Sequence, residues 1–259
     1  MSKKRVYIYD GSYQGLLSAI YAALKERVIP VRIIKNDSYR NDLFYDKIVI
    51  ESSEKNAEFL SEKIKTNISS NSLRYLFHSF HSELEKIEDY IYLYILMGFK
   101  YGDKIDNKLT EKYVRKVHDA AAKVRRESHR YKGLIRFKEA AGGKFYAAVE
   151  PDYNILILIA PHFKNRLSTQ DWIIHDKLRE SAVIYSAEDH EWLLIDLKSD
   201  FEPDLSEEEN NIQDLWKSFF SAVSIKNRLN PKLQRQFMPK KYWKYLIEKP
   251  GSSNKIRLE

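Results

Sequence analysis

The sequence predicts an α+β protein, and three observations lead to that class. Strand-like alternation and helical spacing follow one another in the first third, which is typical of a β-α-β-like region with further helices. A long basic helix then precedes short strand-like segments joined by turns, and these predict a mostly antiparallel central sheet packed on that helix. Helical spacing returns near the C-terminal end, so we expect C-terminal helices.

The elements of the first third follow from apolar spacing and from turn residues. Alternation predicts strands over 5–9, 30–34 and 47–50, and helical spacing predicts helices over 13–26, 53–65 and 70–99. Ser53 is the expected N-cap of the second helix, and the third is interrupted near Ile87. Residues 98–107 are polar and rich in turn formers, so we expect an N-terminal region over 1–104 and a second region over 105–259.

The rest of the chain is predicted in the same way. Residues 112–132 have helical apolar spacing, and Gly142-Gly143 is a tight turn between strands over 133–138 and 144–149. Further strands are expected over 154–159, 172–175, 182–185 and 191–196. Ser206 and an acidic first turn open a helix over 205–223, and Pro231 and Pro239 each favour the start of a short helix.

Composition limits the classes of function. The chain has 259 residues, a formal net charge of +7 and no cysteine, which excludes disulfides, thiol catalysis and thiolate-bound metal centres. No apolar run reaches the roughly 18 residues of a membrane span, and the N-terminus resembles a strand more than a secretory signal. We therefore expect a cytoplasmic protein without a membrane partner.

Charge is distributed unevenly along the chain. Residues 112–144 hold eleven Lys/Arg against three Asp/Glu, a balance of +8, and residues 211–259 show the same numbers. Residues 186–214 hold eleven Asp/Glu against one Lys, a balance of −10. Two basic segments favour a polyanionic partner, although a solvated charged face is the alternative for each.

The first candidate site is the C-terminal half of the basic helix. Arginine binds phosphate oxygens in a two-pronged manner and stays charged at any relevant pH. His129 is a candidate acid or base, or else a residue packed at the helix end. The residues expected to contact nucleic acid here are Arg125, Arg126, Arg130, Lys132 and Arg136.

The second candidate site is a set of histidines and carboxylates at predicted strand ends and loops. Acid-base chemistry on DNA would use His162, His175, Asp152 and Asp176 of this set together with His129 of the basic helix. The alternative is that the aspartates shape turns and the histidines bond within the sheet. The spacing matches no metal-binding motif, so the sequence indicates no metal ligand and no cofactor.

The third candidate site lies near the C-terminus, where cations alternate with aromatic residues. Cations bind phosphates and exposed aromatic rings stack on bases, so this pattern suits single-stranded or unstacked DNA. The alternative is that Trp243 and Phe237 anchor the terminal helices in the core. The expected nucleic-acid contacts are Arg235, Lys240, Lys241, Tyr242, Trp243 and Lys244.

Six blocks spread over the chain together resemble an uncharacterised bacterial family associated with DNA metabolism and DNA repair. They are 9–17 (YDGSYQGLL), 126–137 (RESHRYKGLIRF), 150–152 (EPD), 160–163 (APHF), 172–176 (WIIHD) and 230–244 (NPKLQRQFMPKKYWK). The chain departs from the expected pattern at Ser128 and Leu134, where Ala and Phe are expected. Members resemble companions of a radical-SAM DNA-repair protein, and some relatives are fused to uracil-DNA-glycosylase-like domains. The resemblance implies DNA as the working context and a radical-SAM protein as a partner, but it supplies no catalytic residue.

Three hypotheses on function remain at this point. The first is a DNA-binding accessory protein of DNA repair or metabolism that presents single- or double-stranded DNA to a partner enzyme. The second is a DNA-processing enzyme, a nuclease or a glycosylase-like protein, that uses the His/Asp set. The third is a protein-interaction module whose basic faces bind an acidic protein. The sequence does not decide whether the protein is an enzyme.

Overall fold

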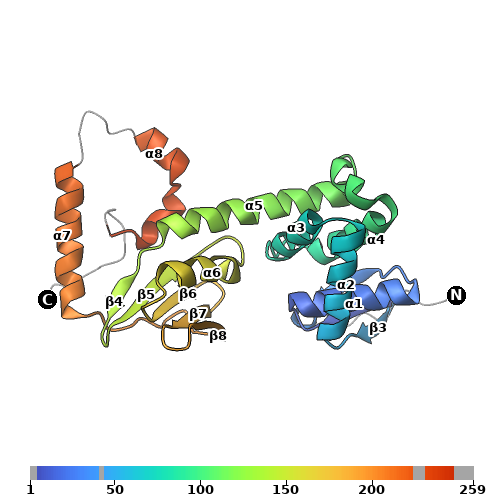
Figure 1. Ribbon diagram of the computed structural model, residues 1–259, viewed down its shortest axis with the longest axis horizontal. Helices are drawn as coiled ribbons and strands as arrows, with labels where there is room; N and C mark the ends of the chain where they lie inside the picture. The colour runs from blue at the N-terminus through green and yellow to red at the C-terminus, as the bar shows by residue number, and fades with distance from the viewer. Residues whose placement is uncertain (1–4, 41–43, 224–230, 248–259) are drawn as a thin grey trace. The chain divides into compact units, whose positions relative to one another are not determined.

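The computed structural model describes residues 5–40, 44–223 and 231–247, without the side chains of 220–223, 231, 234 and 237 (Figure 1). The chain folds into two compact units, Met1–Arg126 and Glu127–Glu259. The structure is mixed α and β, as the sequence predicts, and each unit has its own sheet. The regional boundary after residue 104 stays a prediction.

The first unit contains a small parallel sheet. Strands β1 (Arg5–Tyr9), β2 (Arg32–Lys35) and β3 (Asp46–Val49) lie in the order β2-β1-β3, with both pairings parallel. Parallel neighbours need a crossover, and α1 (Tyr13–Glu26) supplies the first one between β1 and β2. A 3₁₀ turn, η1 (Asn36–Ser38), follows β2. This confirms the β-α-β-like start that alternation and helical spacing predict.

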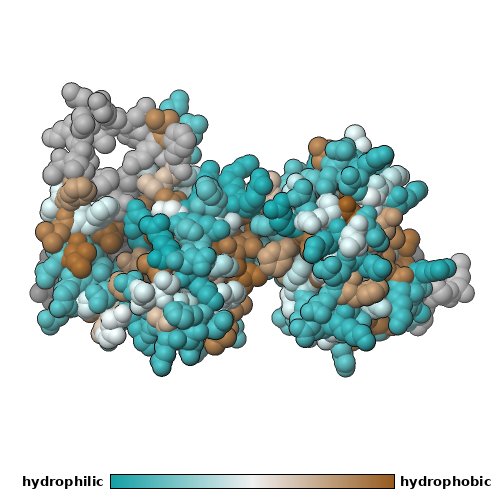
Figure 2. Space-filling view, in the orientation of Figure 1, coloured by the Kyte–Doolittle hydropathy of each residue, from teal (hydrophilic) through white to brown (hydrophobic). Residues whose placement is uncertain are grey.

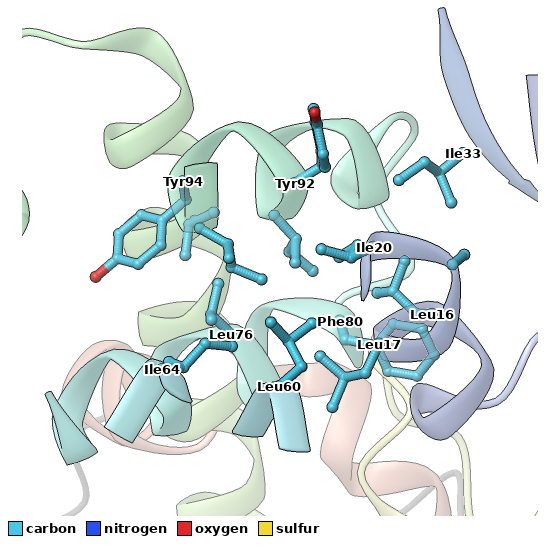
Figure 3. Close-up of a cluster of buried hydrophobic side chains, with 14 of the residues drawn as sticks. Leu16, Leu17, Ile20, Ile33, Leu60, Ile64, Leu76, Phe80, Tyr92 and Tyr94 are labelled. Carbon is cyan, nitrogen blue, oxygen red and sulfur yellow. The ribbon is translucent and has the colours of Figure 1, made fainter. Parts of the chain in front are cut away.

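Four consecutive helical elements follow β3 in this unit and contribute to its core. They are α2 (Glu54–Asn67), α3 (Ser70–Phe80), α4 (Ile87–Tyr101) and η2 (Gly102–Asn107), so the predicted interruption near Ile87 separates α3 from α4. Ser53 caps α2 as predicted, because its side chain accepts the Asn56 N–H. Apolar side chains from α1, α2, α3 and α4 meet in one buried cluster (Figure 3).

The turn between β1 and α1 is held by side-chain hydrogen bonds. Asp10 Oδ1 accepts the backbone N–H and the hydroxyl of Ser12, at 2.9 and 2.7 Å, and Oδ2 accepts the Ser52 hydroxyl at 2.6 Å. Ser12 in turn accepts the Gly15 N–H at 2.8 Å and so caps α1. A side chain at Gly15 would place its Cβ 2.1 Å from Asp10 Oδ1, so this turn requires glycine there.

The second unit is built on a five-stranded sheet. Its strands are β4 (Lys138–Ala140), β5 (Lys144–Val149), β6 (Trp172–Asp176), β7 (Ser181–Ser186) and β8 (Glu191–Asp196), in that spatial order. The β5–β6 pairing is parallel and the other three pairings are antiparallel. The predicted mostly antiparallel sheet is therefore confirmed, and its parallel pairing follows from the helix between β5 and β6.

That helix is the main local error of the sequence-based prediction. The strand expected over 154–159 is wrong, because residues 156–159 form the first turn of α6 (Leu156–Arg166); Pro161 and His162 also lie in this helix. The buried residues Leu156, Ile159, Ala160 and Phe163 have i, i+3, i+4, i+7 spacing, the signature of a buried helix face. The strand expected over 133–138 is also wrong, because the basic helix α5 (Lys112–Leu134) continues to Leu134 and β4 begins at Lys138.

The C-terminal elements begin where the sequence predicts. They are α7 (Glu207–Val223), α8 (Pro231–Phe237) and a 3₁₀ helix, η4 (Lys240–Tyr245). Ser206 accepts the Glu209 N–H at 3.1 Å and opens α7, and Pro231 is the first residue of α8. Residues 225–230 of the predicted basic segment lie outside the described residues. In the part of the chain that the structure describes, we find no helix with the length and apolar character of a membrane span.

Candidate nucleic-acid interface

Helix α5 presents an exposed basic face within the first unit. Val114, Val117 and Ala120 are buried in the core of that unit, which fixes the rotation of the helix about its axis. The exposed positions on the other side are mostly cations, with Asp119 as the exception: Lys112, Arg115, Lys116, Asp119, Lys123, Arg125 and Arg126. Among the described residues, no ion pair engages Arg115, Lys116 or Lys123, so their charges face solvent.

The predicted contact residues that follow in the second unit differ in their exposure. His129 is exposed, whereas Arg130 and Lys132 are half-buried. Arg136 is also half-buried and donates to the Gly133 carbonyl at 3.4 Å. The predicted contacts at this end of α5 are therefore exposed in part.

Glu127 is the acidic residue in the part of α5 that belongs to the second unit, and its side chain is buried. Its carboxylate accepts the backbone N–H groups of Asp152 and Tyr153, at 3.2 and 2.9 Å. Lys241 Nζ lies 2.7 Å from Glu127 Oε1 and also bonds to the Asp152 carboxylate. Burial alone would lower the pKa of Lys241, but the hydrogen bonds to Asp152 and Glu127 raise it well above its usual value. Lys241, expected to contact DNA, is thus held by two carboxylates.

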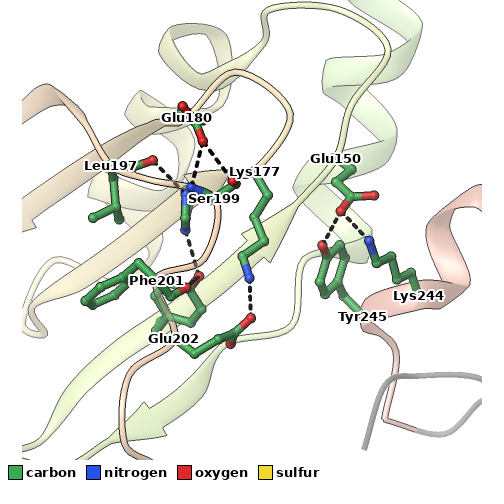
Figure 4. Close-up of polar contacts among 11 residues, drawn as sticks. Glu150, Lys177, Glu180, Leu197, Ser199, Phe201, Glu202, Lys244 and Tyr245 are labelled. Atoms are coloured by element: carbon green, nitrogen blue, oxygen red, sulfur yellow. Dashed lines mark hydrogen bonds and ion pairs between the residues drawn. The ribbon is translucent and has the colours of Figure 1, made fainter.

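Lys244 is held in the same way by Glu150. Figure 4 shows the Glu150 carboxylate receiving both the Lys244 ammonium and the Tyr245 hydroxyl, the latter at 2.7 Å. Burial alone would raise the pKa of Glu150, but these two hydrogen bonds lower it below its usual value. Two of the expected nucleic-acid contacts in η4, Lys241 and Lys244, are therefore bound to acidic side chains of the segment 150–152.

The aromatic residues of η4 serve packing. Tyr242 is buried, and its ring meets that of Tyr131 edge to face, with centroids 5.1 Å apart. Trp243 is half-buried and donates its indole N–H to the Met238 carbonyl at 2.9 Å. Arg235 and Lys240 are exposed. The anchoring alternative therefore fits Trp243, whereas the side chain of Phe237 lies outside the described part of the structure.

Arg179 connects the segment 150–152 to the turn after β6. Its guanidinium donates to the carbonyls of Pro151 and Asp152 and to Asp176 Oδ2, each at 3.0 Å. Asp176 is fully buried, and its other oxygen accepts the Leu178 and Arg179 N–H groups. Burial raises the pKa of Asp176, in spite of the Arg179 charge beside it. Asp176 thus acts as a turn former, the alternative role that the sequence allows.

The five candidate catalytic residues do not form one cluster. His175 is fully buried, with Nδ1 2.8 Å from the Tyr146 hydroxyl and Nε2 3.1 Å from the Leu197 carbonyl. Because His175 and Asp176 are consecutive in β6, their side chains point to opposite faces of the sheet. His162 is half-buried on α6, where burial and the charges of Lys132 and Arg166 lower its pKa. Over the described residues, no group of three His, Asp or Glu side chains has the arrangement of a metal site.

Comparison with known proteins gives the family. A family model described as a domain of unknown function, DUF4130, matches residues 85–248. The match begins just before α4, continues through η4 and covers more than half of the chain, so the chain belongs to this family. No curated protein and no solved structure matches the chain.

Proposed function

We propose that the protein binds DNA through the exposed basic face of α5, as an accessory that presents DNA to a partner enzyme in DNA repair or metabolism. One observation carries the proposal, the contrast between two sets of cations. Arg115, Lys116 and Lys123 face solvent without an ion pair among the described residues, whereas Lys241 and Lys244 are bound to carboxylates. Cations without a protein partner bind phosphate without first breaking an intramolecular ion pair.

The geometry of a straight helix suits a phosphate backbone. A rise of about 1.5 Å per residue places Arg115 and Lys123 about 12 Å apart along α5. Such a row can neutralise several phosphates and release their counterions, which makes binding steeply dependent on salt. Tyr242 and Trp243 are engaged in packing, so we propose contact with the backbone without reading of the base sequence.

The partner enzyme in this proposal is a radical-SAM DNA-repair protein. This part of the proposal rests on the resemblance of the six sequence blocks to the family. No reaction is proposed for the protein itself, because His175 and Asp176 point to opposite faces of the sheet and each is engaged in hydrogen bonds within the fold.

The proposal is tested by fluorescence anisotropy, in which the full-length protein is added to labelled 25-nucleotide single-stranded DNA or to labelled 25-base-pair duplex DNA. The double variant Lys116→Gln/Lys123→Gln removes two charges from the α5 face. Lys55→Gln/Lys104→Gln is the matched control, because it removes two exposed lysines of the same unit outside α5. At about 0.1 M salt we expect the α5 variant to lose at least about tenfold in affinity and the control less than about threefold. Equal losses in the two variants, or no binding by the wild type, would refute the proposal.

A further inference from the structure

Helix α7 belongs to the second unit and contacts the sheet of that unit through polar side chains. Glu209 and Gln213, four residues apart, are both buried. Glu209 accepts the backbone N–H of Glu139, at the edge of the sheet in β4, at 3.0 Å, and the side-chain amide of Gln213 at 2.7 Å. These bonds and the Ser206 cap fix the rotation of α7 about its axis.

The same rotation leaves a row of large apolar side chains in solvent. Ile212, Leu215 and Phe219 are 53%, 70% and 57% exposed, and Trp216, which is partly covered and in ring contact with Phe219, is 39% exposed. Their i, i+3, i+4, i+7 spacing places all four on one side of the helix, and we call them the α7 stripe. Figure 2 shows hydrophobic surface where α7 lies in Figure 1. A contiguous exposed apolar stripe of this kind marks an interaction site.

The N-terminal end of the α7 stripe is acidic. Glu208 is exposed and lies four residues before Ile212, so it continues the stripe along the same side of the helix. Among the described residues, no ion pair engages Glu207 or Glu208. The exposed pair Asp214–Lys217, 2.9 Å apart, lies on the other side of the helix by its spacing. A ligand of the stripe therefore meets apolar surface that ends in carboxylates without an ion-pair partner among the described residues.

We propose that the α7 stripe docks a basic amphipathic helix of a partner protein. Helices recognise apolar stripes through residues at i, i+3, i+4 and i+7, the spacing that the stripe itself has. A cation beside Glu208 completes the match. This proposal is independent of DNA binding by α5.

Charge selects such a partner over a second copy of the chain. A parallel pairing of two α7 helices places Glu208 of one copy beside Glu208 of the other. An antiparallel pairing places Glu208 beside the C-terminal carbonyl groups of the partner copy, which carry negative partial charge. Both arrangements bring like charges together.

The test measures binding of fluorescein-labelled 18-residue peptides to the full-length protein by anisotropy. One probe is a Leu/Lys amphipathic helix, and the second is the same peptide with Glu in place of Lys. We expect the Leu/Lys peptide to bind at least tenfold more tightly than the Leu/Glu peptide. Leu215→Ser should weaken this binding at least tenfold, whereas Leu193→Ser, an equally exposed leucine in β8, should leave it unchanged.

A charge reversal and a sedimentation experiment complete the test. Glu208→Lys should weaken the binding of the Leu/Lys peptide and strengthen the binding of the Leu/Glu peptide. A surface that binds only through nonspecific hydrophobic contact would show neither change. Circular dichroism should show unchanged folding, because Leu215 and Glu208 are both exposed. Binding that is absent or indifferent to Leu215→Ser would overturn the proposal. A concentration-dependent dimer in analytical ultracentrifugation that Leu215→Ser abolishes would also overturn it, by assigning the stripe to a second copy.

Discussion

Replacing Lys241 with Met tests whether the contacts of Lys241 are structural. Glu127 is buried, with its side chain 4% exposed, and Lys241 supplies its counter-charge at 2.7 Å. Removing one partner of a fully buried ion pair costs roughly 3–5 kcal/mol. Lys241 itself is 36% exposed and Glu127 keeps two backbone N–H donors, so solvent screening reduces the expected loss to about 2 kcal/mol.

The assay is urea denaturation followed by tryptophan fluorescence. All four tryptophans, at positions 172, 192, 216 and 243, belong to the second unit, so the signal reports on the unit that contains Lys241. Lys217→Met is the matched control, because Lys217 and Asp214 form a similarly short ion pair, 2.9 Å, between two exposed side chains, and we expect a loss below about 0.5 kcal/mol.

A double-mutant cycle separates the ion pair from general packing. In a Glu127→Gln background the buried charge is gone, so Lys241→Met should cost at least about 1 kcal/mol less than in the wild type. Equal losses for Lys241→Met and Lys217→Met, or a cost of Lys241→Met that is unchanged by Glu127→Gln, would show that the ion pair does not stabilise the unit.

Two further predictions concern the first unit. His81 is buried, and burial lowers its pKa to about 4. Unfolded His81 takes up a proton near pH 6.5, so stability should fall as the pH drops from 6.5 to 4. Between pH 7 and pH 5 the loss is about 2 kcal/mol, and circular dichroism in urea should show it in the wild type but not in His81→Leu. Gly15→Ala should lower the thermal midpoint by at least about 4 °C, because its Cβ would meet Asp10. Gly133→Ala, where the added Cβ meets nothing within 4 Å in a helix, should leave the midpoint unchanged or raise it. The opposite order of the two glycine variants would contradict this account of the β1–α1 turn.

Local signals predicted local structure well. Serines before helical spacing predicted the starts of α2 and α7, and Pro231 predicted the start of α8, because a cap needs only residues within one turn. The strand expected over 154–159 was wrong because a short apolar run has no period that distinguishes a buried strand from a buried helix.

The candidate site depended on contacts that span most of the chain. Lys241 and Glu127 are 114 residues apart, and Lys244 and Glu150 are 94 apart, so no local pattern shows that these cations are paired. Strand alternation did contain one usable signal. His175 and Asp176 are neighbours in β6, and consecutive strand residues cannot face the same site.

The salt dependence of DNA binding tests the central claim most directly. In a plot of log affinity against log salt concentration, we expect a slope of about −4 for the wild type, corresponding to four or five phosphate contacts. Arg115→Gln/Lys116→Gln/Lys123→Gln should flatten this slope by about 3, since each lost contact removes about 0.9, while Lys241→Gln should leave it unchanged. A wild-type slope near zero would contradict DNA binding by this face. A slope that changes with Lys241→Gln but not with the triple α5 variant would contradict it as well.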